Sequence, residues 1–183
     1  MGNQNEGGLL SPFLQRIRIN AIKPYLQGYV LDYGCGNGSV ANYISPNFYR
    51  GYDVDAASLE VAKSRFPDHF FSNELPTKIK FDCLLLSAVI EHIDDPKGLL
   101  LKTQPLLNPK GRIIVTTPHP SYQWIHELGS KLKVFSLEAA SEHKTLLDEQ
   151  SFYEIITGLP FQICIYQRFL FGANQLLILE FKS

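Results

Sequence analysis

Short apolar segments alternate with helical segments along most of this chain of 183 residues. We expect strands at 29–33, 48–54, 69–72, 81–88 and 111–117, separated or preceded by helices at 11–25, 38–44, 56–66 and 95–107. A helix near 149–157 then precedes two strands at 161–169 and 174–182. This alternation predicts an α/β fold with a doubly wound, mostly parallel sheet and helices on both faces.

The two final strands are separated by only four residues, which predicts an antiparallel hairpin. The sheet is therefore expected to have seven strands and to end with an antiparallel C-terminal strand. Because the chain has the length of one domain and contains no linker, we expect a single domain over residues 1–183.

The composition limits the classes of partner. Hydrophobic residues make up 45% of the chain, charged residues 19%, and the net charge is −1 at pH 7. Without a basic stripe, nucleic acid and anionic membranes are not expected as partners, and no apolar run approaches the roughly 18 residues of a membrane span. Three widely spaced cysteines form no zinc or disulfide pattern, which fits a reducing cytoplasm. We expect a cytoplasmic protein that binds no metal.

The first predicted strand runs into a glycine-rich turn, VLDYGCGNGSV at 30–40, with Asp32 two residues before Gly34. In doubly wound sheets, ligands bind at the carboxyl ends of the strands. One interpretation is a dinucleotide site with its pyrophosphate at this turn. However, Ser39 replaces the third glycine, and Asp32 would face two phosphate charges with no nearby Lys or Arg to compensate.

The second interpretation is S-adenosylmethionine, which has no phosphate but carries an ammonium and a sulfonium. A carboxylate at Asp32 is then favourable, because it can hold the turn and face the amino end of the ligand. In the segment GYDVD, Asp53 ends the second strand and can accept both ribose hydroxyls of any adenosine-type ligand. Asp53 therefore does not discriminate between the two ligands, whereas Asp32 favours S-adenosylmethionine.

These motifs resemble those of the class I, Rossmann-like, S-adenosylmethionine-dependent methyltransferases. The segments FDCLLLSAVIEHIDDP at 81–96 and LLNPKGRIIVTTPHP at 106–120 follow in the order of that family, so the resemblance covers roughly residues 28–120. The parts EHIDDP and TTPHP are most similar to the small-molecule branch that includes ubiquinone-biosynthesis and sugar methyltransferases.

The resemblance implies a cofactor, S-adenosylmethionine, and a product, S-adenosylhomocysteine. By position, the resemblance implies that the methionine moiety contacts Asp32, Gly34, Cys35 and Gly36, and that Ser87 and Ala88 border its end at the exit of strand four. It implies that Asp53 binds the ribose and that Val54 and Asn73 contact the adenine. Asn73 stands where this family often has an acid, so its contact would be uncharged. Cys35 has no basic neighbour to make it a thiolate, and we expect it to pack.

Methyl transfer is an in-line displacement in which the enzyme aligns the two substrates and removes a proton where the acceptor requires it. The candidate bases beside the sulfonium are Glu91, His92 and His119. Each also has a structural interpretation: Glu91 as a hydrogen-bond acceptor, His92 as a support of its loop and His119 as the filling of a turn between two prolines. We expect the helix 11–25 and the segment 118–147 to form the substrate lid, with Tyr122, Trp124, His126, Phe135 and His143 as candidate contacts.

The chain lacks the N-P-P-Y pattern of base and amide methyltransferases and the Asp and Asn pair of the magnesium-dependent catechol type. We therefore expect methyl transfer to a small-molecule acceptor, with oxygen as the favoured acceptor atom. One alternative is an NAD(P)-dependent oxidoreductase, which Asp32 and the missing Tyr-x-x-x-Lys pair disfavour. Another is a catalytically inactive, cofactor- or partner-binding member of the fold. A small lid is consistent with a bulky acceptor or with closure by a second subunit in a homodimer.

Overall fold

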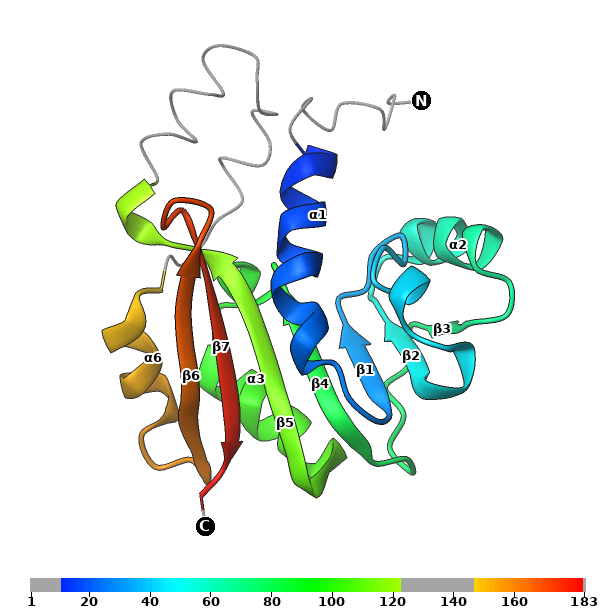
Figure 1. Cartoon of the computed structure of the whole chain (residues 1–183). Coiled ribbons are helices and arrows are strands. Elements are labelled where there is room, and N and C mark those ends of the chain that lie inside the picture. The colour runs from blue at the N-terminus through cyan, green and yellow to red at the C-terminus, as the bar shows by residue number, and fades with distance from the viewer. Residues whose placement is uncertain (1–10, 123–146, 183) are drawn as a thin grey trace.

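The computed structural model describes residues 11–122 and 147–182, which form a seven-stranded sheet flanked by helices (Figure 1). The strand order is β3-β2-β1-β4-β5-β7-β6. The strands are β1 Val30–Tyr33, β2 Tyr49–Tyr52, β3 Phe70–Ser72, β4 Phe81–Ser87, β5 Leu107–Pro118, β6 Phe161–Phe169 and β7 Asn174–Phe181. The pairs among β1 to β5 are parallel, whereas β7 pairs antiparallel with both β5 and β6. The predicted fold class is confirmed, including its antiparallel C-terminal strand.

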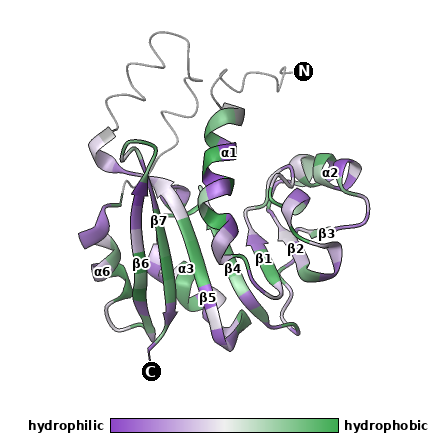
Figure 2. Ribbon diagram, in the orientation of Figure 1, coloured by the Kyte–Doolittle hydropathy of each residue, from purple (hydrophilic) through white to green (hydrophobic). Residues whose placement is uncertain are grey.

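Helices cover both faces of this sheet, as the sequence predicts. The helices are α1 Ser11–Ile22, α2 Ala56–Arg65, α3 Pro96–Thr103 and α6 Glu149–Ile156. Figure 1 shows α1 in front of the sheet and α3 behind it. Side chains alternate between the two faces of a strand, and β4 follows this rule: Leu85 packs with α1, and Leu84 packs with α3 and α6. The middle part of β5 is accordingly apolar, whereas its ends are polar (Figure 2).

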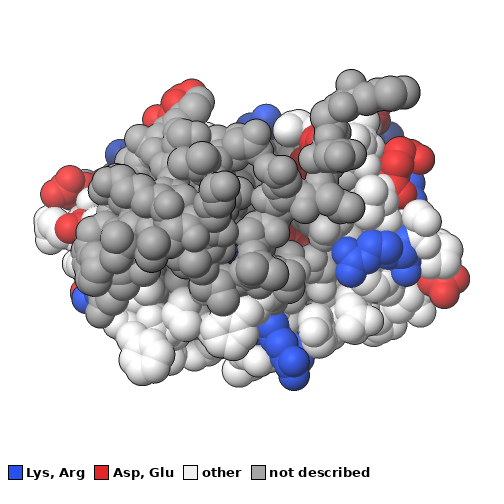
Figure 3. Space-filling model, turned by 90° about the horizontal axis from the view of Figure 1, so that it is seen from above, with Lys and Arg blue, Asp and Glu red and all other residues white. Residues whose placement is uncertain are grey.

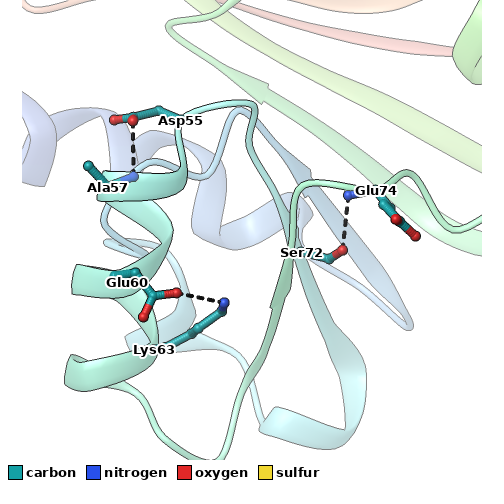
Figure 4. A network of polar contacts seen from close by, with 6 residues as sticks. All are labelled: Asp55, Ala57, Glu60, Lys63, Ser72 and Glu74. Atoms are coloured by element: carbon teal, nitrogen blue, oxygen red, sulfur yellow. Dashed lines mark hydrogen bonds and ion pairs between the residues drawn. The ribbon is translucent and has the colours of Figure 1, made fainter.

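The face of the sheet that α1 covers is also covered by α2, which lies at the edge of the sheet. Ile19 and Ile22 of α1 pack against Val30 and Leu85, whereas α2 packs against a separate cluster around Tyr49 and Phe71. Asp55 caps the N-terminus of α2, because its carboxylate accepts a hydrogen bond from the Ala57 amide at 3.1 Å (Figure 4) and one from the Ser58 amide at 3.2 Å. This cap fixes the chain directly after β2.

The predicted helix at 38–44 is wrong as an α-helix, because the structure has one 3₁₀ turn there, Ala41–Tyr43. Gly38 has a φ of +76°, which is outside the helical region. At the other end, Pro46 restricts Ser45 to an extended backbone, and Ile44 is extended as well. Too few residues remain between these limits for an α-helix. The glycine turn therefore does not lead into a helix whose positive end could hold a phosphate.

The other differences from the expected elements concern their ends. The helix α3 ends at Thr103, and Pro105 lies in a 3₁₀ turn, Gln104–Leu106, that leads directly into β5. Across the described ranges, no helix is long and apolar enough to cross a membrane.

Candidate functional site

A cavity of about 340 Å³ opens at the carboxyl ends of β1 and β4, beside α1. Six residues predicted to contact the cofactor line it: Asp32, Gly34, Cys35, Gly36, Ser87 and Ala88. The rest of its wall consists of Gln15, Arg18, Ile19, Asn37, Ser39, Val40 and Ser58. Its volume lies at the lower end of the range of small-molecule sites, about 300–1,000 Å³. The sequence therefore located the cavity and placed the helix 11–25 over the site as part of the lid, but it did not name the three α1 residues in the wall.

The glycine turn adopts a backbone conformation that suits glycine. Gly34 and Gly36 have φ values of +76° and +49°, in the region that other residues rarely adopt. A Cβ atom on Gly34 would lie 2.5 Å from Cγ2 of Val89, whereas a Cβ on Gly36 would meet nothing within 4 Å. Gly34 is thus required for packing against the exit of β4, and the open space at Gly36 belongs to the cavity.

Asp53 holds this turn in place. Its Oδ2 accepts a hydrogen bond from the Gly36 amide at 2.7 Å, and its Oδ1 accepts one from the Asp55 amide at 3.0 Å. We expected Asp32 to hold the turn, and that expectation is wrong. Each carboxylate oxygen of the half-buried Asp53 retains a second lone pair, so it can still accept hydrogen bonds from a ligand.

Asp32 is instead a buried acid in the cavity wall. Its side chain is 2% exposed, and its Oδ2 accepts a hydrogen bond from the Tyr49 hydroxyl at 2.8 Å. Burial raises the pKa of Asp32 to about 7; the Tyr49 hydrogen bond opposes this shift and the charge of Asp53 adds to it. A carboxylate in such a place is stabilised by a cationic ligand group.

Arg18 of α1 is the basic residue that sequence reasoning missed. It lines the same cavity as Asp32, although it precedes the glycine turn by 16 residues in the sequence. Its Nε donates a hydrogen bond to Oδ1 of Asn174 at 3.0 Å. Burial lowers the pKa of Arg18, and the charge of Glu91 opposes this. The spacing of Arg18 from Ile22 was a usable signal, because residues four apart share one face of a helix.

The predicted adenine contacts lie outside this cavity. Val54 is 79% exposed, and Asn73 is exposed as well. Both follow the ends of neighbouring strands, which the hydrogen bond from the Asp53 amide to the Ser72 carbonyl at 3.2 Å holds together. Figure 4 shows the two segments, with Ser72 accepting a hydrogen bond from the Glu74 amide. They form an open continuation of the sheet edge beyond Asp53.

Cys35 lines the cavity and also packs into the core. It is 8% exposed and belongs to the apolar cluster with Tyr49 and Leu59. Burial raises the pKa of its thiol, and the charges of Asp32 and Asp53 raise it further. The thiol is therefore neutral at physiological pH, in agreement with the expected packing role.

The exit of β4 is shaped by an unusual backbone position. Ala88 has a φ of +57°, which a residue with a side chain adopts only when its surroundings enforce it. Its amide donates a hydrogen bond to the Thr116 carbonyl at 2.8 Å, and the Ser87 and Thr116 hydroxyls lie 3.1 Å apart. These contacts fix the part of the cavity wall predicted to border the methionine end.

The three candidate bases do not line this cavity. Glu91 is buried in the short 3₁₀ turn after β4, whereas His92 in the same turn is exposed. His119 is 8% exposed, and its Nδ1 accepts a hydrogen bond from the Ser121 amide at 3.1 Å. Burial lowers the pKa of His119, and the charge of Arg168 lowers it further. A neutral ring with that hydrogen bond carries its proton on Nε2, so its one acceptor nitrogen is already occupied by the Ser121 amide.

Most of the predicted lid segment lies outside the described residues. Trp124, His126, Phe135 and His143 fall within 123–146, and the side chain of Tyr122 is likewise not described. The other half of the predicted lid, α1, contributes three residues to the cavity.

Solved structures of several methyltransferases share this architecture. The plantazolicin methyltransferase BpumL, in complex with a monoazolic desmethylPZN analog and SAH, matches with a TM-score of 0.75 at 15% identity, covering 94% of this chain and 86% of that chain. A possible histamine N-methyltransferase of Thermotoga maritima matches with a TM-score of 0.71 at 17% identity, covering 95% and 92%. At these identities the likeness establishes the fold alone.

The family follows from the sequence itself. A family model described as a methyltransferase domain matches residues 7–163, most of the chain, and the chain belongs to that family. The predicted resemblance to S-adenosylmethionine-dependent methyltransferases is thereby confirmed, and with it the class of cofactor. The match favours this interpretation over the oxidoreductase alternative.

Two curated relatives extend this result. An uncharacterized methyltransferase of Mycobacterium tuberculosis is 29% identical over 109 residues, 54% of this chain and 55% of the relative. A ubiquinone biosynthesis O-methyltransferase of Coxiella burnetii is 23% identical over 156 residues, 76% of this chain and 67% of the relative. The chain thus spans about half the length of the first relative and two thirds of the second.

Proposed function

We propose that this chain binds S-adenosylmethionine in the cavity at the end of β1 and transfers its methyl group to a small-molecule acceptor, at oxygen. One observation carries the cofactor assignment: a buried acid, Asp32, and a half-buried cation, Arg18, line the same cavity. A zwitterionic amino-acid end needs such a pair, with Asp32 for its ammonium and Arg18 for its carboxylate. The open space at Gly36 admits the ligand to the backbone of the turn.

The adenosine half would then lie along the open edge beyond the cavity. Asp53 would accept hydrogen bonds from the ribose hydroxyls while it holds the turn through Gly36. The adenine would pack on the exposed Val54, with the side-chain oxygen of Asn73 accepting from its amino group. An adenine bound there would cover Val54, which is 79% exposed in the free chain.

The contribution of the protein to methyl transfer is then chiefly alignment. The walls at Asp32 and Arg18 would fix the amino-acid end, and Asp53 would fix the ribose. The sulfonium, which supplies the electrophilic methyl group, would be held between these two contacts. The rigid exit of β4, with Ala88 at its positive φ, would set the direction from which an acceptor approaches.

Two observations support a small acceptor and transfer to oxygen. The relative from Coxiella burnetii is an O-methyltransferase of ubiquinone biosynthesis. The net charge is −1, and acidic and basic side chains are interspersed over the described part of the face in Figure 3. On the described part of that face there is no continuous basic stripe of the kind that nucleic acid binds. A homodimer and a cytoplasmic location stay predictions, as do a metal-free site, one domain over 1–183 and a lid formed by 11–25 and 118–147.

The test is thermal unfolding of the full chain with S-adenosylmethionine, S-adenosylhomocysteine, NADH and NADPH in parallel. A ligand at 100 times its Kd adds about 2.7 kcal/mol to folding, and Tm rises by about 2–4 °C per kcal/mol in a domain of this size. We expect a rise of several degrees with the two adenosyl ligands alone. A rise with the nicotinamides alone would contradict the assignment of Asp32, and no rise with any ligand would leave a non-enzymatic member of the fold.

A further inference from the structure

The connection after β1 leaves part of the sheet without a covering helix. Where a helix was expected at 38–44, the chain forms the 3₁₀ turn Ala41–Tyr43 and then a second one, Pro46–Phe48. Doubly wound sheets are normally covered by helices on both faces, and two single turns occupy less space than a helix. A cavity of about 460 Å³ opens here, between α1 and the end of α2, the two helices that flank these turns in Figure 1.

This cavity, the α1–α2 groove, is built from three elements and carries positive charge. Its volume lies within the range of small-molecule sites. No acidic residue of the described chain lines it, whereas two arginines do. The lining consists of Gln15, Arg16 and Ile19 of α1, Ser39, Asn42 and Tyr43 of the connection after β1, and Arg65 and Phe66 at the end of α2.

Arg16 and Arg65 line the groove without a carboxylate partner in the described part of the chain. Nη1 of Arg65 donates a hydrogen bond to the Asn37 carbonyl at 3.2 Å, and its guanidinium carbon lies 5.2 Å from the centre of the Phe66 ring. These contacts hold the guanidinium in place, and a guanidinium has more donors than this one bond uses. Two positive charges in one cavity repel each other, and an anion bound to both offsets that repulsion.

Aromatic rings form the apolar part of the groove. Tyr43 and Phe66 both line it, and Tyr43 is 43% exposed in the free chain. Nζ of Lys23 lies 3.7 Å from the centre of the Tyr43 ring, a cation–π contact that holds the ring. Lys23 lines a neighbouring cavity of about 500 Å³ that Tyr43 lines as well, so a third positive charge lies close to the groove.

These wall groups define the chemistry of the ligand. The planar fork of a guanidinium matches the two oxygens of a carboxylate or a phosphate, and Arg16 and Arg65 approach from two different helices. The rings of Tyr43 and Phe66 suit an aromatic body attached to that anion. The methyl donor fits less well, because its ammonium would find no acid among the described residues of the groove.

We propose that the α1–α2 groove is a second ligand site, which binds a small aromatic molecule with a carboxylate or phosphate group. Arg16 and Arg65 bind the anionic group, and the aromatic body packs on Tyr43 and Phe66. This site is separate from the proposed methyl-donor cavity and does not depend on methyl transfer. Carboxylates and phosphate esters share the required chemistry, and the experiment distinguishes them.

The groove adjoins the methyl-donor cavity, but the two cavities use different cations. Both are lined by Gln15, Ile19 and Ser39, so a ligand in the groove lies beside the donor. Arg18 lines the donor cavity and Arg16 lines the groove, because residues two apart on a helix do not face each other. An anion could also bind at Arg18, and the experiment must therefore separate these two places.

The experiment measures binding of small probes to the full chain by calorimetry, at low and at high salt. The probes are benzoate and phenyl phosphate, with inorganic phosphate as an anion without a body, benzyl alcohol as a body without charge and benzylamine as a body of opposite charge. The site variants are Arg16→Met and Arg65→Met. Lys63→Met is the matched control, because it removes one positive charge from the surface of α2 but Lys63 does not line the groove.

Two further measurements test the place of binding. Titration with saturating S-adenosylhomocysteine present fills the donor cavity, and Arg18→Met removes the cation of that cavity without any cofactor. Tm and affinity for S-adenosylhomocysteine are measured for every variant. Arg16→Met is the decisive variant, because Arg16 is exposed, whereas Arg65 also supports the glycine turn through Asn37.

We expect benzoate and phenyl phosphate to bind more tightly than inorganic phosphate, and benzyl alcohol and benzylamine not to bind. The Kd of the two aromatic anions should rise about tenfold or more in Arg16→Met and in Arg65→Met, as for loss of one charge-assisted hydrogen bond, and it should rise with salt. Lys63→Met, Arg18→Met and saturating S-adenosylhomocysteine should change that Kd by less than about threefold. Arg16→Met should keep the wild-type Tm and affinity for S-adenosylhomocysteine.

Four results would overturn the inference. The first is loss of probe binding with S-adenosylhomocysteine or in Arg18→Met, which would place the anion in the donor cavity. The second is an equal loss in Lys63→Met, which would make the effect one of general surface charge. The third is unchanged affinity in Arg16→Met, and the fourth is no binding of either aromatic anion, or binding of benzyl alcohol that is equally tight. Failure of the wild type to bind S-adenosylhomocysteine would instead overturn the proposed function, and Arg18→Met would still test the groove, so the two failures are distinguishable.

Discussion

At the scale of single residues, Asp32 links the site to pH. Its pKa is raised to about 7 in the free chain, mainly by burial, and an ammonium group would bind only its ionised form. Below pH 7 the binding of S-adenosylhomocysteine must therefore release a proton from Asp32. We expect the Kd to rise as the pH falls from 8 to 6, by at most about tenfold per pH unit. Calorimetry in buffers of different ionisation enthalpy would detect that proton.

The matched variant for this prediction is Asp32→Asn, which keeps an acceptor for the Tyr49 hydroxyl. Its affinity should be lower and nearly independent of pH between 6 and 8. A wild-type affinity that does not vary over this range would remove Asp32 from contact with the amino end.

The same carboxyl affects folding in the absence of ligand. A carboxyl whose folded pKa lies above its unfolded value of about 3.9 favours the folded state at low pH. That advantage is lost as the pH rises through about 7. Asp32→Asn should therefore raise the free energy of unfolding at pH 8, by roughly 1–4 kcal/mol at 1.36 kcal/mol per pKa unit. Urea unfolding at pH 5 and pH 8 checks this; a variant destabilised at both would contradict it.

Asp53 holds the glycine turn and is proposed to bind the ribose, and the two tasks can be separated. Asp53→Ala removes the expected ribose contacts and also the acceptor of the Gly36 amide. We therefore expect the free energy of binding S-adenosylmethionine to weaken by up to roughly 1.5–3 kcal/mol per lost charged hydrogen bond. Asp53→Asn keeps one oxygen for either task and should show an intermediate loss. Unchanged affinity in Asp53→Ala would exclude the residue from the site.

At the scale of elements, the two glycines of the turn should respond differently to alanine. Both have positive φ values, which cost an alanine roughly 1–2 kcal/mol. Gly34→Ala also forces Cβ against Val89, whereas Gly36→Ala meets only the open cavity. We expect the larger loss of Tm in Gly34→Ala and the larger loss of ligand affinity, relative to stability, in Gly36→Ala. Equal effects of the two variants on both properties would contradict this account.

Elements with a strong local sequence pattern were predictable. A short segment whose flanking residues restrict its backbone was not. The strand at 81–88 is apolar enough to be recognised, and Asp55 marks the start of α2 as a capping residue. The predicted helix at 38–44 failed because Gly38 and Pro46 restrict the backbone from both sides. Their combined effect on so short a segment outweighs the helical preference of the residues between them.

At the scale of the whole molecule, the site joins residues that are far apart in the sequence. Arg18 and Asn174 are 156 residues apart and share a hydrogen bond. Only the strand order, with β7 beside β5, brings them together, and a sequence pattern does not encode that order by itself. The sequence could therefore place the glycine turn and its acids, whereas the position of Arg18 in the cavity and its contact with β7 required the fold.

This connection predicts a long-range effect of ligand binding. Because Arg18 contacts the cavity and β7, binding of S-adenosylhomocysteine should slow hydrogen exchange in α1 and also at the start of β7 near Asn174. Exchange measured by mass spectrometry would show both, and Arg18→Met should abolish the change in β7 while Arg16→Met should not. Protection confined to the glycine turn would contradict a role of Arg18 in binding.

The 3₁₀ turn Ala41–Tyr43, which follows the glycines where a helix was expected, also bears on attempts to redesign this protein. Exchanging the methyl donor for a dinucleotide would require more than neutralising Asp32. The segment between Gly38 and Pro46 is too short and too constrained to form a helix, so no row of free amide groups would face a pyrophosphate. The preference for the methyl donor over a dinucleotide thus depends on the length of the segment between Gly38 and Pro46 as well as on the charge of Asp32. A change of ligand would need residues inserted into that segment.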